Sequence, residues 1–165
     1  MKKLLFILVA FGLVGGTLHS QSQRRVLLAH FTQASCGPCA TYNPGVQAII
    51  AANPDKITYI KYQTSWPGYD PMNLHNPTEV ASRVSLYGVS GVPASVLDGN
   101  YYNGHPSGWN VGTINARYAM PTPIEIQMQH SLNAAQDTVF VTMLVKATGP
   151  VSGNIAAYIG VVEKH

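Results

Sequence analysis

The sequence predicts an α/β domain followed by a β-rich segment, and two observations predict it. A nearly continuous apolar run, Val26–Phe31, precedes Cys36-Gly37-Pro38-Cys39, a helical pattern and a second β-rich run, which is the layout of a parallel βαβ unit. After Pro121-Thr122-Pro123 the pattern changes to strands alone. We therefore expect a βαβ…ββα sheet with helices on both faces in residues 21–120, and a second, β-rich domain in residues 121–165.

Residues 1–20 have the pattern of a secretory signal peptide. Lys2 and Lys3 form its positive start, Leu4 to Val14 is an apolar stretch too short to cross a bilayer comfortably, and Ser20 is a small residue suited to cleavage. An uncleaved membrane anchor is the alternative. Export would place the mature chain in an oxidising compartment, where a C-x-x-C pair can persist as a disulfide. We expect no transmembrane span once the leader is removed.

The charge balance argues against nucleic acid as a partner. The chain has ten Lys and Arg residues against seven Asp and Glu. Without Lys2 and Lys3 of the leader, eight basic residues oppose seven acidic ones, for a net charge of +1. No basic patch remains that would bind phosphates.

The first elements follow from their apolar patterns. Arg24–Phe31 reads as a strand buried on both faces, because nearly every position is apolar. A helix is expected from about Cys36 to Ala52, with Pro44 inside it as a kink and Asn53-Pro54 at its end. The run Ile57–Gln63 is expected to form the second strand.

The next helix has clear boundary signals. Asn76 is expected as its N-cap, Pro77 as its first residue and Gly88 as its end, and Glu79 stands three residues after the cap. The remaining elements expected before the linker are a strand at Ala94–Leu97, a returning strand at Tyr101-Tyr102 and a helix at Asn110–Met120.

Three strands are expected after the linker, at Ile124–His130, Thr138–Lys146 and Asn154–Val162. Several positions are apolar on both faces of these strands, and three strands bury too little surface to form a sandwich core. We therefore expect this segment to be an incomplete domain that is completed by further chain or by another surface.

The two cysteines, Cys36 and Cys39, predict a dithiol redox site. A helix N-terminus stabilises a thiolate, so Cys36 is expected to be the nucleophile and Cys39 the resolving thiol, with Pro38 stiffening the turn. A purely structural disulfide is the main alternative. A metal site is not expected, because the sequence has no second C-x-x-C and no H-x-x-x-H.

The chain resembles the thioredoxin-like family at Phe31, Cys36-Gly37-Pro38-Cys39, Pro44 and Val92-Pro93. The resemblance implies thiol–disulfide exchange on protein thiols, with no cofactor besides a redox-active Cys36–Cys39 disulfide and with a separate electron donor or acceptor. It also implies a cis peptide bond before Pro93, close to the dithiol. The backbone of Val92 would then pair with an extended substrate segment beside Gly37 and Pro38.

Two residues depart from the family pattern. Ser35 stands where a Trp usually precedes the first cysteine, and His30 stands where a buried Asp assists proton transfer. His30 is a candidate for the same proton transfer, or else a polar side chain whose hydrogen bonds are satisfied and which has no catalytic role. Trp66 is a candidate for the substrate rim, with ordinary loop packing as the alternative.

A narrower resemblance is to secreted proteins related to outer membrane protein 28 of Gram-negative bacteria. The segment from Trp66 to Met72, the segment from Asn76 to Val80 and the trailing strands carry it. It implies an immunoglobulin-like β domain after the thioredoxin-like one, and a location in the periplasm, at the outer membrane or outside the cell. It also keeps open a second function, a non-catalytic binding or structural module of the cell envelope.

Overall fold

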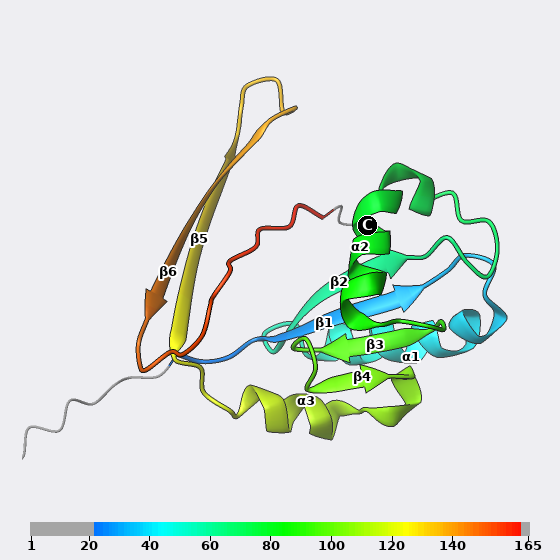
Figure 1. Ribbon diagram of the computed structural model, residues 1–165, viewed down its shortest axis with the longest axis horizontal. Helices are drawn as coiled ribbons and strands as arrows, with labels where there is room; N and C mark the ends of the chain where they lie inside the picture. Colours follow the sequence, from blue (N-terminus) through cyan, green and yellow to red (C-terminus); the bar gives the residue numbers. More distant parts are fainter. Residues whose placement is uncertain (1–21, 163–165) are drawn as a thin grey trace, which may run out of the picture.

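The computed structural model describes residues 22–162, which have a mixed α/β fold. Four strands form one mixed sheet of order β2-β1-β3-β4 (Figure 1). Strands β1 and β2 are parallel, as expected for a βαβ unit, and β3 is antiparallel to both of its neighbours. The strands are β1 (Val26–Thr32), β2 (Ile57–Gln63), β3 (Ala94–Leu97) and β4 (Tyr102–Gly104). The expected signal peptide lies outside the described residues.

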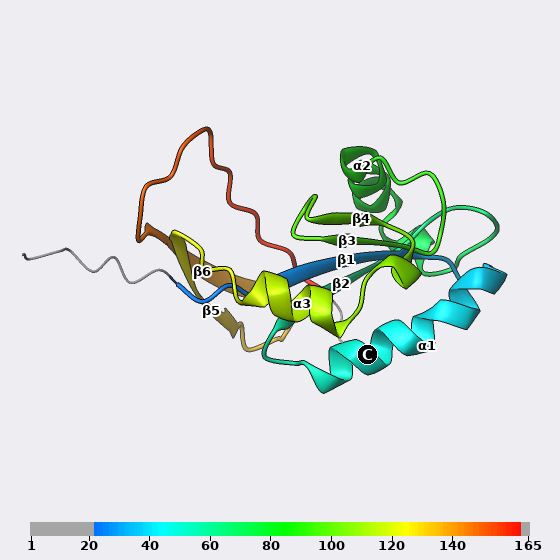
Figure 2. The ribbon, with the colours of Figure 1, turned by 90° about the horizontal axis from the view of Figure 1, so that it is seen from below.

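Helices cover both faces of this sheet, as the sequence predicts. Figure 2 shows α1 and α3 on one face and α2 on the other. The helices are α1 (Gly37–Ala52), α2 (Pro77–Tyr87) and α3 (Val111–Tyr118), and short 3-10 turns occupy Asn73–His75 and Pro106–Gly108.

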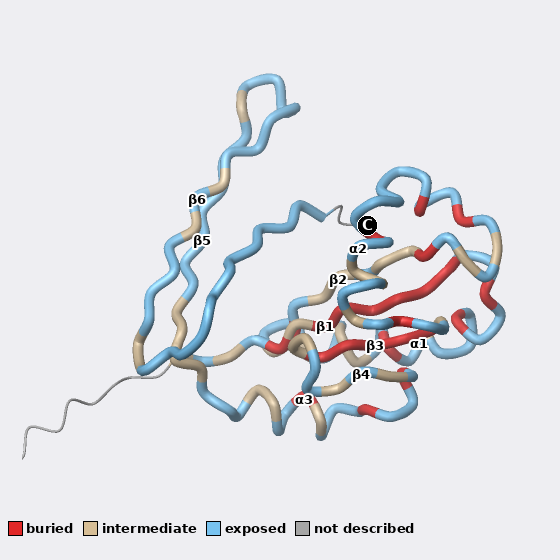
Figure 3. The backbone as a smooth tube through the Cα atoms, viewed as in Figure 1, coloured by how far each residue is buried: buried red, intermediate tan, exposed pale blue. Residues whose placement is uncertain are grey.

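Strand β1 lies at the centre and is buried from both sides (Figure 3). Its side chains alternate between the faces, since successive residues of a strand point in opposite directions. Val26 and Leu28 belong to a core with α1 and α3, whereas Ala29 and Phe31 belong to a core on the α2 side. The other buried members of the first core are Val46, Ile57, Leu97, Trp109 and Ile114, and those of the second are Val89, Ala94 and Val96.

Helix boundaries largely follow the local signals. Helix α2 begins at Pro77 and ends at Tyr87, and it is capped by Gly88, whose φ of 62° suits a residue without a Cβ. Asn76 stands at the N-cap, but its side chain makes no capping hydrogen bond. Helix α3 is shorter than expected because Asn110 is its cap rather than its first turn, in a reciprocal capping box with Thr113.

The C-terminal part forms a two-stranded hairpin, β5 (Ile124–Leu132) with β6 (Val139–Ala147). It extends away from the four-stranded sheet, with exposed side chains on both faces (Figures 1 and 3). The expected third strand, Asn154–Val162, is wrong, because residues 150–162 have no regular structure. Apolar residues alone do not make a strand when no neighbour pairs with its backbone. Residues 22–162 therefore show no immunoglobulin-like sandwich.

None of the helices within residues 22–162 has the length and apolar character needed to cross a membrane.

Candidate redox site

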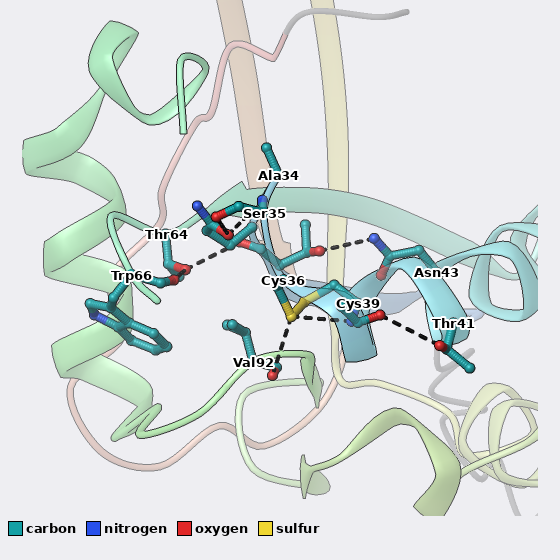
Figure 4. The surroundings of a disulfide bond; sticks show 12 residues. Ala34, Ser35, Cys36, Cys39, Thr41, Asn43, Thr64, Trp66 and Val92 are labelled. Carbon is teal, nitrogen blue, oxygen red and sulfur yellow. Dashed lines mark hydrogen bonds between the residues drawn. A yellow bond between two sulfur atoms is a disulfide. The ribbon is translucent and has the colours of Figure 1, made fainter. Parts of the chain in front are cut away.

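Cys36 and Cys39 are joined by a disulfide at the start of α1 (Figure 4). Their Cα atoms are 5.2 Å apart, within the range that a disulfide spans. Gly37 and Pro38, between them, are exposed. The chain reaches this place because β1 ends at Thr32 and a short loop leads directly into the helix.

Within residues 22–162, the helix start supplies a hydrogen-bond donor to the sulfur of Cys36 and not to that of Cys39. Cys36 is the N-cap residue, and its Sγ accepts a hydrogen bond from the backbone N–H of Cys39 over 3.1 Å. The first turn of α1 contains no acidic residue that would oppose a negative charge there. Both features stabilise a thiolate at Cys36 after reduction.

The loop before β3 lies against the same sulfur. The carbonyl oxygen of Val92 is 3.6 Å from Cys36 Sγ (Figure 4). In the disulfide this sulfur has no hydrogen, whereas the reduced thiol would donate one to that carbonyl. The Val92–Pro93 peptide bond is cis, which confirms the expectation from the sequence, and Pro93 is buried. The fold thus brings Val92 and its neighbouring proline to the dithiol.

Both cysteines are nearly inaccessible to solvent. Cys36 retains 4% of its exposed area and Cys39 retains 1%. Cys36 is therefore only slightly more exposed than Cys39. A difference in reactivity between the two sulfurs has to come from the helix start and the Cys39 amide rather than from accessibility.

The long loop after β2 is hydrogen-bonded, through buried polar groups, to the loop between β1 and α1 that leads to Cys36. The buried carboxylate of Asp70 accepts hydrogen bonds from the backbone N–H groups of Ala34, at 2.8 Å, and of Met72 and Asn73. The side chain of Gln33 donates to the carbonyl of Tyr69 over 2.9 Å. These bonds hold the backbone just before Cys36 in one position.

The central strand carries a buried polar network beneath α1. His30 is fully buried, and its two ring nitrogens lie 3.0 Å from Ser95 Oγ and 2.9 Å from Asn43 Oδ1. Since the amide oxygen only accepts, Nε2 carries the proton and Nδ1 accepts from the Ser95 hydroxyl. Asn43 in turn donates to Thr32 Oγ1 over 2.9 Å.

Burial lowers the pKa of His30 below its ordinary value. The hydrogen bond to Asn43 opposes this by raising the pKa, and the positive charge of Lys61 lowers it further. The imidazole is therefore neutral near pH 7, with both nitrogens satisfied.

A hollow of about 180 Å³ opens beside Cys36. It lies between the N-terminal half of α1 and the end of β2, on the same face of the sheet as His30. Its lining residues are Thr32, Gln33, Ala34, Cys36, Ala40, Asn43, Lys61, Gln63 and Met72.

Trp66 and the exposed histidines within residues 22–162 do not line this hollow. Trp66 is half-buried and packs against the core on the α2 side, the same core that Val92 packs against. His75, His105 and His130 are exposed. In the described part of the chain, no three His, Cys, Asp or Glu side chains gather as metal ligands would.

Sequence reasoning missed Asp70, Asn43 and Lys61. Asn43 stands four residues after Cys39, hence on the same face of the helix, and this spacing was the available signal. Lys61 is the one charged residue of β2, and it pairs in register with His30. For Asp70, no local signal distinguishes a buried anchor from an ordinary turn residue.

Comparison of the chain with protein-family models, curated proteins and solved structures found no match.

Proposed function

We propose that the protein is an exported thiol–disulfide oxidoreductase that acts on protein thiols through Cys36 and Cys39. The observation that carries the proposal is the environment of Cys36. Its sulfur accepts the Cys39 amide hydrogen at a helix start and faces the carbonyl of Val92. A disulfide that merely tied two segments together would not need this arrangement.

The exchange proceeds in two steps. A substrate thiolate attacks Cys36 Sγ, the Cys36–Cys39 bond breaks, and its electron pair leaves on Cys39 as a thiolate. A second substrate thiolate then attacks the substrate sulfur of the mixed disulfide, and Cys36 leaves as a thiolate stabilised by the Cys39 amide. The substrate thiols are oxidised to a disulfide, their protons pass to solvent or to the cysteines, and a separate thiol–disulfide couple reoxidises the pair. In the reverse direction the same steps reduce a substrate disulfide.

The proposal gives His30 a supporting role. Its neutral ring is held by Ser95 and orients Asn43, whose side chain lines the hollow beside Cys36. Proton transfer to Cys39 is not required of it in the steps above.

The proposed architecture is a thioredoxin-like domain followed by a β-rich segment. A parallel β1-α1-β2 unit, an antiparallel β3-β4 pair and helices on both faces support the first part. The β5–β6 hairpin after the linker supports the second. The proposal also includes a relationship to the secreted proteins similar to outer membrane protein 28. It includes a location in the periplasm or at the outer membrane as well.

The near-complete burial of both sulfurs favours a second candidate, a binding or structural module of the cell envelope with a structural disulfide. The two functions differ in turnover. Insulin reduction and oxidation of a dithiol peptide should both be measured with the wild type and with Cys36→Ser. The oxidoreductase is supported if the wild type is active in either assay and Cys36→Ser abolishes that activity. The binding or structural module is supported if the wild type is inactive in both assays although its disulfide can be reduced.

A further inference from the structure

The hollow beside Cys36 has an electropositive lining. Lys61 is its one charged side chain, and no acidic residue lines it. The N-terminus of α1 opens onto the same space through Cys36 and adds the positive end of the helix dipole. Two separate sources of positive potential therefore meet next to the reacting sulfur.

Lys61 is exposed and has no ion-pair partner within residues 22–162. The ion pairs in this part of the chain join Asp98 to Arg24 and to Arg117. Asp70 is a buried carboxylate whose hydrogen bonds reach two lining residues, Ala34 and Met72. It accepts three backbone N–H groups in all and makes no ion pair with Lys61. The ammonium group is thus free to bind an anion that enters the hollow.

The remaining lining suits a peptide rather than a bare anion. The Oε1 atom of Gln63 is a buried acceptor without a hydrogen-bond partner in this part of the chain. Rotation of the Gln63 side chain toward the hollow that it lines would let this oxygen accept a hydrogen bond from a backbone N–H of a bound peptide. Ala40 and Met72 supply apolar surface for the methylene groups of a side chain, and a hollow of about 180 Å³ has room for about one such side chain.

We propose that this hollow is a specificity subsite that takes an acidic side chain next to the reacting cysteine of a polypeptide substrate, with Lys61 binding the carboxylate. This assignment rests on the proposed exchange at Cys36 and goes beyond it by naming the class of substrate. Binding the flanking residue here would hold the substrate sulfur beside Cys36 Sγ.

The test compares peptides that contain one cysteine flanked by Glu, Gln or Lys. Their rates of attack on the oxidised protein are measured by mass spectrometry at equal thiolate concentration. The Glu peptide should react about two- to fivefold faster than the Gln peptide, the size expected for a partly exposed ion pair, and the Lys peptide should be slowest. Lys61→Met should abolish the order and Lys61→Glu should reverse it. Lys146→Glu, on the distant β6 strand, makes the same change in net charge and should leave the order unchanged.

A binding measurement separates this proposal from the proposed function. With the cysteine of each peptide replaced by serine, the Glu peptide should shift the amide NMR signals of Ala40, Asn43 and Gln63 more than the Lys peptide. This result would hold even if the protein turned over no substrate. Equal shifts, or an order that survives Lys61→Glu, would overturn the subsite. The same rates should also be measured with two small thiols, the anionic mercaptopropionate and the neutral mercaptoethanol. If mercaptopropionate is favoured over mercaptoethanol as strongly as the Glu peptide is over the Gln peptide, the negative charge alone explains the preference, and the assignment to polypeptides is overturned.

Discussion

The backbone N–H of Cys39 donates a hydrogen bond to Sγ of Cys36 over 3.1 Å. The two residues are therefore unequal although both are buried. One sulfur has a donor aimed at it and caps a helix, while the other lies a turn further in.

We predict that this inequality is visible as a difference in thiol reactivity. In the reduced protein, iodoacetamide should label Cys36 several-fold faster than Cys39, because its thiolate is stabilised by the helix start. Peptide mass spectrometry of samples quenched over time measures both rates. Denatured protein is the control and should show similar rates, and equal rates in the native protein would contradict the assigned roles.

Stability should fall in acid because of His30. Burial lowers its folded-state pKa, whereas in the unfolded chain the pKa is about 6.5. The unfolded state therefore binds more protons below this pH, so the stabilisation is present above about pH 6.5 and is lost as pH falls through the folded pKa. Urea unfolding between pH 4.5 and 8 should show this fall. In His30→Gln the dependence should be flatter, and an unchanged slope would show that other groups cause it.

Gly68 is predicted to be a position where an added side chain is costly while Ser35 is present. A Cβ at Gly68 would collide with the hydroxyl of Ser35 but would lie 3.5 Å from its Cβ, an ordinary contact. The Ser35 hydroxyl would have to rotate away and lose its hydrogen bond to Gln33, so Gly68→Ala should destabilise the protein by about 0.5–1.5 kcal/mol. In a Ser35→Ala background the same substitution should cost less than half of this. Additive costs in the double-mutant cycle would rule out the contact as the cause.

Asp70 should be among the most important polar residues for stability. Asp70→Ala removes the acceptor of three backbone N–H groups and should cost about 2–4 kcal/mol. It should also increase amide exchange at Ala34, directly before the dithiol. Asp55→Ala, at an exposed aspartate, is the matched control and should change stability little. A similar small effect at Asp70 would mean that the loop is held mainly by other contacts.

The β5–β6 hairpin should exchange its amide hydrogens much faster than β1. Only two strands form its ladder and both faces are exposed, so local opening costs little free energy. Hydrogen exchange followed by mass spectrometry should show full exchange at Ile126 and Val145 while Leu28 is still protected. Comparable protection in both sheets would indicate that another surface covers the hairpin in solution.

Many element boundaries could be predicted from local signals. The bounds of β2 and β3 and the start of α2 are as expected, because a β-rich run or a proline at a helix start acts over a few residues. The prediction of a strand at Asn154–Val162 is wrong because strand formation depends on more than local signals. A strand needs a paired neighbour, and composition does not report whether one is there.

The sequence by itself determined the dithiol, because Cys36 and Cys39 are three residues apart and a helix start brings such residues together whatever the rest of the chain does. It also determined the strand–helix–strand order around them. Only the tertiary structure decided what surrounds the sulfurs: Val92 comes from a loop 56 residues away, Asp70 from another loop, and Lys61 from the neighbouring strand. Their positions depend on β1 pairing with both β2 and β3, which is set by burial of two cores and by long-range register rather than by any local preference.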